Sequence, residues 1–208
     1  TARCKTSRMI DYLNPEAIEA FIRVGYEPYY QELKDYWEHI WAMFCDEPYS
    51  GLYAWDQMVG TLGTSLMYNP GLYTEFQEKM GYDIKNHLYA LIWPTDQNST
   101  KWRNDFYQVY AERVQRIFFA PLAKWSHDHN VLFVGHELMT QLNGHWAFTT
   151  TEGFDVVANF GADHFGIGQY KDVSTTDSGS FDRNIAAKLA SSVAHVYEKN
   201  GSMLEQYT

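Results

Sequence analysis

The sequence predicts an α/β fold, a (β/α)8 TIM barrel that is present here as a partial barrel of about four βα units. Apolar runs bounded by turn residues predict buried strands at residues 40–45, 131–134, 165–167 and 202–205. Helical patterns alternate with these runs, and the gap from a helix end to the next strand is short. This alternation is typical of parallel strands that are connected by helices.

The length of the chain sets how much of such a barrel it can form. A whole barrel takes about 250 residues, and this chain has 208. We therefore expect residues 1–208 to be part of a catalytic (β/α)8 barrel domain, completed by the remainder of a larger chain.

Helix boundaries follow from capping signals. Asn14-Pro15-Glu16 combines an N-cap residue, a proline at the first helical position and an acidic first turn, and Asn69-Pro70 repeats the first two. The longest helical pattern, at residues 102–129, has apolar residues spaced by three and four positions. The predicted helices cover residues 15–33, 72–80, 102–129, 154–162 and 181–199.

Composition and charge exclude several classes of function. Hydrophobic residues make up 45% of the chain and charged residues 20%, which indicates a globular protein. The net charge of -10 argues against nucleic acid and anionic membrane surfaces, which both attract Lys and Arg. No apolar stretch approaches the ~20 residues of a membrane span.

The aromatic content allows two interpretations. Aromatic residues make up 17% of the chain, with 7 Trp and 16 Tyr. Their flat apolar faces and polar edges suit the C–H faces and hydroxyls of a sugar. An aromatic-rich core explains the same composition, and composition alone leaves both open.

Carboxylates follow three of the predicted strands. Asp46 and Glu47 end the first strand, His136 and Glu137 follow the second, and Glu205 closes the fourth. An unpaired carboxylate is too costly to bury, so these groups must face a cleft, a metal or a solvated loop. Because parallel strands end at the same edge of a sheet, we expect the three glutamates to converge there. The alternative is a set of helix caps and ordinary loop charges.

Metal and cofactor motifs are weak. His127, His129, His136 and His145 lack the spacing of a zinc site. No motif requires a cofactor, and a hard cation such as Ca2+, held by Asp and Glu oxygens, fits this chain better than zinc. The phosphate-binding glycine loops and the Gly-x-Ser-x-Gly motif of serine hydrolases are also absent from the sequence.

Several segments, in order along the chain, resemble α-L-rhamnosidase-like glycoside hydrolases (glycoside hydrolase family 106 and its relatives). The matching segments are Asp11-Tyr12-Leu13-Asn14-Pro15-Glu16-Ala17, Phe44-Cys45-Asp46-Glu47-Pro48, Arg103-Asn104-Asp105-Phe106-Tyr107, Gly135-His136-Glu137 and Leu204-Glu205-Gln206-Tyr207. The resemblance implies a barrel glycosidase that cleaves a terminal α-L-rhamnose or similar sugar from a poly- or oligosaccharide.

The resemblance also implies roles for individual residues. Glu47 would be the general acid, and Glu137 or Glu205 the base or nucleophile. The resemblance favours inversion of configuration, with Ca2+ near the sugar hydroxyls. The substrate class implies that the protein is secreted or periplasmic. The residues expected to bind the sugar are Asp46, His136, Trp55, Trp146 and Tyr207.

Two alternatives remain open. One is a retaining, β-galactosidase-like barrel glycosidase, whose two carboxyl groups lie about 5–5.5 Å apart rather than about 6.5–9.5 Å. The other is a carbohydrate-binding barrel without catalytic activity.

Overall fold

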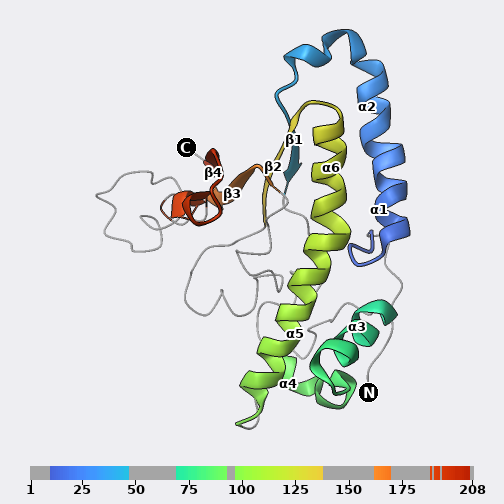
Figure 1. Ribbon diagram of the computed structural model, residues 1–208, viewed down its shortest axis with the longest axis vertical. Helices are drawn as coiled ribbons and strands as arrows, with labels where there is room; N and C mark the ends of the chain where they lie inside the picture. Colours follow the sequence, from blue (N-terminus) through green and yellow to red (C-terminus); the bar gives the residue numbers. More distant parts are fainter. Residues whose placement is uncertain are drawn as a thin grey trace.

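The computed structural model describes residues 10–46, 69–92, 97–137, 162–169, 188, 190–192 and 194–206. For His136, Glu137 and Glu205 the description extends to the backbone only. The predicted helix at 154–162 lies outside the described residues apart from Ala162, and of the one at 181–199 the structure describes residues 188, 190–192 and 194–199. Helices make up most of the described part, which also contains four short strands (Figure 1).

The first helical segment begins where its cap predicts. The side chain of Asn14 accepts a hydrogen bond from the backbone N–H of Glu16 (3.0 Å), and Pro15 takes the first helical position. The segment then continues through a π-helical turn and ends in a 3-10 helix. Its elements are α1 (Pro15–Phe21), η1 (Ile22–Tyr26), α2 (Glu27–Glu32) and η2 (Lys34–His39).

A second group of helices follows at residues 69–92, in the order α3 (Pro70–Met80), η4 (Ile84–His87) and α4 (Tyr89–Ile92). The backbone N–H of Leu72 donates to the side chain of Asn69 (3.1 Å), which confirms the predicted cap. Gly81 ends α3 in the left-handed conformation, with φ of 77°, which glycine adopts at little cost.

One long helical rod runs through the middle of the molecule (Figure 1). It consists of α5 (Ser99–Val114), the π-helical turn η5 (Gln115–Phe119) and α6 (Ala120–Asp128). Pro121 follows η5 by two residues, just as Pro28 follows η1. Proline lacks an N–H and clashes with the carbonyl of residue i-4. A wider turn before each proline gives that carbonyl room, so the helix continues instead of breaking.

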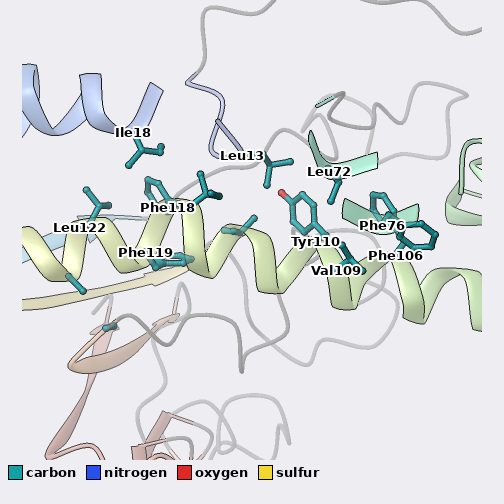
Figure 2. Close-up of a cluster of buried hydrophobic side chains, with 14 of the residues drawn as sticks. Leu13, Ile18, Leu72, Phe76, Phe106, Val109, Tyr110, Phe118, Phe119 and Leu122 are labelled. Atoms are coloured by element: carbon teal, nitrogen blue, oxygen red, sulfur yellow. The ribbon is translucent and has the colours of Figure 1, made fainter. Parts of the chain in front are cut away.

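The main core lies between these helices rather than around a barrel. Large side chains from α1, α3 and the rod interlock there with less than 2% of their surface exposed, as Figure 2 shows for Ile18, Leu72, Phe76 and Phe106. Burying such side chains contributes about 1.5–3 kcal/mol each. Tyr110 belongs to the same cluster, so part of the aromatic content is core.

A second aromatic cluster fixes the first helical segment to α6. The Trp125 indole N–H donates to Glu27 Oε1 (2.6 Å), and the Trp37 indole N–H donates to the backbone carbonyl of His129 (2.8 Å). The His129 ring stacks on Trp125, with ring centroids 4.0 Å apart, and Tyr30 meets it edge-on at 4.4 Å. Both indole N–H groups therefore have acceptors, and the contact is specific as well as apolar.

The four strands form one parallel sheet in the order β1-β2-β3-β4. Their bounds are β1 (Ala42–Asp46), β2 (Leu132–Glu137), β3 (His164–Gln169) and β4 (Gly201–Gln206). Each overlaps a strand predicted from an apolar run. One face is covered by helices, because Met43, Cys45 and Phe133 pack against the helical core.

The prediction of a (β/α)8 TIM barrel, or of four βα units of one, is wrong. A barrel unit has one covering helix after each strand. Here α3 to α6 all lie between β1 and β2, and they bury their apolar faces largely against one another and against α1. Within the described residues the sheet has four strands and does not close, with β1 and β4 at its two edges.

Candidate functional site

The carboxyl ends of the strands bring several predicted site residues to one edge of the sheet. Asp46 is the last residue of β1, Glu137 the last of β2, and Glu205 the last but one of β4. All neighbouring pairs are parallel, so these backbone positions share an edge. This edge is the candidate functional site.

The register relates the positions to one another. Asp46 pairs directly with His136 on the neighbouring strand. Glu137 pairs with Ile167, which pairs with Leu204, so Glu205 lies one row further along. Neighbouring strands lie about 4.8 Å apart, so the Glu137 and Glu205 backbones are separated by about 10 Å.

Gly135 makes the pairing of β1 and β2 possible just before this edge. A Cβ atom on Gly135 would lie 2.3 Å from the backbone carbonyl oxygen of Cys45, closer than real Cβ atoms approach. The absence of a side chain at this position therefore admits the neighbouring strand.

The last two residues of β1, Cys45 and Asp46, have side chains in very different environments. Burial, and to a smaller extent the nearby Asp46 carboxylate, together raise the pKa of the Cys45 thiol to about 12. A thiol in this environment stays protonated and is a poor nucleophile. The Asp46 side chain, in contrast, is exposed.

Several predicted site residues lie outside the described residues. These are Glu47, Trp55, Trp146 and Tyr207. The convergence of the three glutamates on one cleft therefore stays a prediction, supported at backbone level for Glu137 and Glu205.

Two exposed aromatic residues near β1 were missed from sequence. Trp41 is 62% exposed and Phe44 is 48% exposed, although the apolar run at 40–45 predicted a buried strand. Met43 and Cys45 face the helices, and alternation along the strand places Phe44 and Asp46 on the opposite face. The signal available in the sequence was the spacing of two between Phe44 and Asp46.

The opposite edge of the sheet holds a different polar contact. Asp163 Oδ2 accepts from the backbone N–H of Phe133 (2.8 Å) and lies 2.8 Å from His127 Nε2. This carboxylate ties the end of α6 to the starts of β2 and β3. These contacts give Asp163 a structural role far from the carboxyl edge.

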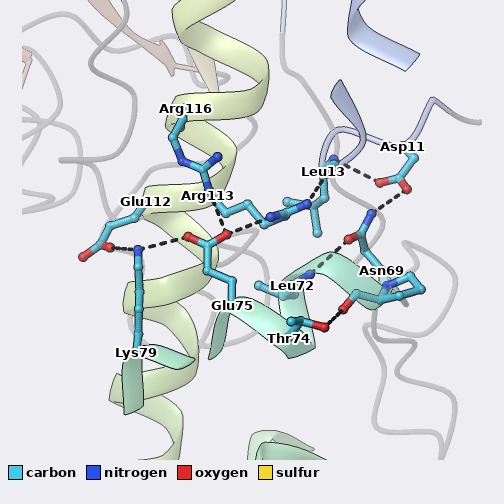
Figure 3. A network of polar contacts seen from close by, with 11 residues as sticks. Asp11, Leu13, Asn69, Leu72, Thr74, Glu75, Lys79, Glu112, Arg113 and Arg116 are labelled. Atoms are coloured by element: carbon cyan, nitrogen blue, oxygen red, sulfur yellow. Dashed lines mark hydrogen bonds and ion pairs between the residues drawn. The ribbon is translucent and has the colours of Figure 1, made fainter. Parts of the chain in front are cut away.

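The most heavily paired carboxylate in the described part lies between helices, well away from the sheet (Figure 3). Glu75 accepts from Arg113 (2.7 Å) and Arg116 (2.7 Å), and Lys79 lies 3.0 Å from its other oxygen. Arg113 also donates to the Leu13 backbone carbonyl (3.0 Å). The network joins α3, the rod and the start of the first helical segment.

No group of three or more His, Cys, Asp or Glu side chains within the described ranges could hold a metal ion. Among the helices of those ranges, none is long and apolar enough to cross a membrane.

No model of a known protein family matches the chain, and no curated protein matches it in sequence. The resemblance to rhamnosidase-like glycosidases therefore stays a prediction that depends on the residues themselves.

Proposed function

We propose that this protein is a glycoside hydrolase that removes a terminal α-L-rhamnose or similar sugar from an oligo- or polysaccharide. The observation that carries the proposal is the carboxyl edge of the sheet. There Asp46 pairs with His136, Glu137 follows immediately, and Glu205 lies two strands away. Carboxylates gathered at strand ends are the groups that glycoside hydrolysis needs.

The proposed mechanism uses a pair of carboxyl groups. Glu47, directly after β1, protonates the leaving oxygen, and Glu137 or Glu205 activates a water on the opposite side of the sugar. Inversion is the mechanism that the resemblance implies, and it requires the carboxyl groups of the acid and the base to lie about 6.5–9.5 Å apart, which leaves room for that water. Asp46 and His136 bind sugar hydroxyls.

The proposed substrate also implies a location and a partner for the protein. A polysaccharide substrate places the protein outside the cytoplasm, in the periplasm or secreted. The net charge of -10 repels nucleic acids, so carbohydrate is the proposed partner.

The test compares single variants on a chromogenic aryl α-L-rhamnoside. Glu47→Gln, Glu137→Gln and Glu205→Gln each keep the size of the side chain and remove its acid. Replacing the acid or the base is expected to lower kcat by about 10²-fold or more. Of Glu137→Gln and Glu205→Gln, the variant that loses this activity therefore identifies the base. Glu38→Gln is the matched control, because the Glu38 side chain is 81% exposed and lies on η2.

The anomeric form of the first product, followed by NMR, separates the inverting mechanism from the retaining one. Unchanged turnover in all three variants would refute the carboxylate mechanism.

A second candidate is a carbohydrate-binding protein without hydrolytic activity. The exposed Trp41 and Phe44 rings favour it, because aromatic faces bind sugars without any chemistry. Saccharide binding without turnover of any glycoside would support this candidate over the enzyme.

A further inference from the structure

Two asparagines of the chain begin the three-residue motif Asn-x-Ser/Thr, in which x is any residue except proline. The motifs are Asn98-Ser99-Thr100 and Asn200-Gly201-Ser202. In secreted proteins this motif is the acceptor of N-linked glycans, and the modified asparagine lies at the surface. The structure describes every residue of both motifs.

The first motif lies at the start of the long helical rod. Asn98 directly precedes α5, and the side chains of Asn98 and Thr100 are both exposed. Ser99, between them, is 0% exposed. Only the middle residue of the motif is therefore packed into the fold, and the two residues on which glycan attachment depends are at the surface.

The second motif leads from the last helical residues into β4. Asn200 lies in an exposed bend, and Ser202, the second residue of β4, is exposed as well. The middle residue is again the one that the fold uses, because a Cβ atom on Gly201 would lie 3.0 Å from His164 Nε2. Both motifs thus present the asparagine and the hydroxyl residue at the surface and pack the residue between them.

Both motifs lie away from the carboxyl edge of the sheet. Asn200 precedes the first residue of β4, whereas Glu205 lies near the other end of that strand. Figure 1 shows α5 beginning at the lower end of the rod, below the sheet. Glycans on these two asparagines would therefore be attached outside the candidate functional site.

We propose that Asn98 and Asn200 are N-glycosylation sites, each of which carries an oligosaccharide. The donor is a lipid-linked oligosaccharide diphosphate, which a transferase of the secretory pathway uses. The asparagine Nδ2 bonds to C1 of the first sugar and loses one proton, while the C1–O bond to the lipid diphosphate breaks and the lipid diphosphate leaves. The inference rests on the location outside the cytoplasm that the proposed function implies, and not on the proposed reaction.

The experiment expresses the full chain behind a signal peptide in cultured eukaryotic cells and analyses both the secreted and the cell-retained protein. Peptide-N-glycosidase releases the glycans in heavy-oxygen water, so each asparagine that carried a glycan becomes a heavy-oxygen aspartate. Peptide mass spectrometry is expected to find this label at Asn98 and Asn200. A parallel digest without the glycosidase measures spontaneous deamidation.

Single variants connect each glycan to its motif. Asn98→Gln and Thr100→Ala are each expected to lose the first glycan, so that the mass of the intact protein falls by one glycan. Asn200→Gln and Ser202→Ala are each expected to lose the second. Asn86→Gln is the matched control, because Asn86 is also exposed but has no Ser or Thr two residues after it.

The outcomes separate this inference from the proposed function. Glycans at both motifs that disappear in Thr100→Ala and Ser202→Ala support it, even if no glycoside is cleaved. Protein without glycans in both fractions overturns it, even if the protein hydrolyses a rhamnoside. Label at one asparagine alone overturns it for the other, and a glycan that persists without the motif's hydroxyl overturns it as well.

Discussion

Replacing Glu75 with glutamine is expected to destabilise the fold by removing the centre of the ionic network in Figure 3. The Glu75 side chain is 14% exposed, and its two oxygens are shared by Arg113, Arg116 and Lys79. Glutamine keeps the size of the side chain and removes its charge. Arg113, only 12% exposed, then keeps a charge without its carboxylate partner, which is costly in a site with little water.

The lowered pKa of Glu75 gives the size of the stability loss expected in Glu75→Gln. Burial by itself would raise this pKa, but hydrogen bonds from Arg113, Lys79 and Arg116 outweigh burial and lower it from 4.5 to about 2. Each pKa unit corresponds to about 1.4 kcal/mol, so the charged form contributes about 3 kcal/mol. Arg116 is 56% exposed, and solvent screening there reduces the expected loss to about 2–3 kcal/mol.

The sign of the pH dependence follows from the same shift. The folded state holds Glu75 ionised at pH values where the unfolded chain binds a proton. The contribution is therefore complete above about pH 4.5 and is lost as the pH falls toward about 2. The difference in stability between wild type and Glu75→Gln is expected to shrink across this window.

Thermal and urea unfolding at pH 7 and at several lower pH values measure this difference. For a chain of this size, about 2–3 kcal/mol corresponds to a fall in Tm of roughly 5–10 °C at pH 7. Glu78→Gln is the control, since Glu78 lies on the same helix and is exposed. Equal effects of the two substitutions, or a difference that does not depend on pH, would refute the reasoning.

Three further outcomes are expected. Gly135→Ala should lower Tm by several degrees in thermal unfolding, because its Cβ would overlap the Cys45 carbonyl oxygen at 2.3 Å; an unchanged Tm would contradict the tight strand pairing. The Cys45 thiol, whose pKa burial raises to about 12, should resist iodoacetamide at pH 8 until the protein is unfolded, as peptide mass spectrometry can show; rapid native labelling would contradict its burial. Asn69→Ala should cost about 1–2 kcal/mol in urea unfolding, because it removes both the cap on Leu72 and the bond to Asp11 (2.9 Å); a loss near zero would show that the cap is dispensable.

Local signals in the sequence predicted local structure well. Asn14 and Asn69 were identified as helix caps, and both accept the expected backbone hydrogen bonds. The four strands were located because each apolar run is short and is bounded by turn residues. These features depend on neighbours in sequence, which a single chain displays directly.

Long-range features could not be predicted in the same way. Whether parallel strands close into a barrel depends on how the helices between them pack, and α3 to α6 pack largely on each other. The apolar run at 40–45 predicted burial, yet Phe44 is exposed because the helices cover only the other face of β1. Two partners of Glu75, Arg113 and Arg116, lie 38 and 41 residues away in sequence, and no local pattern pairs them with it.

The candidate site was predictable only as a set of positions. The carboxylates of Asp46, Glu137 and Glu205 could be identified as strand ends from the runs before them. The register of these strands could not be predicted, because it depends on the close approach of β1 and β2 at Gly135. The pairing of Asp46 with His136 is therefore a contribution of the structure.

The measurement that tests the central claim most directly is hydrolysis of a panel of aryl glycosides, α-L-rhamnoside included, by the full-length protein and its Glu47→Gln and Glu137→Gln variants. The account predicts that the rhamnoside is cleaved and that turnover falls by about 10²-fold or more in Glu47→Gln, with Glu38→Gln unchanged. A well-folded protein that cleaves no glycoside, or a Glu47→Gln variant with full turnover, would contradict it.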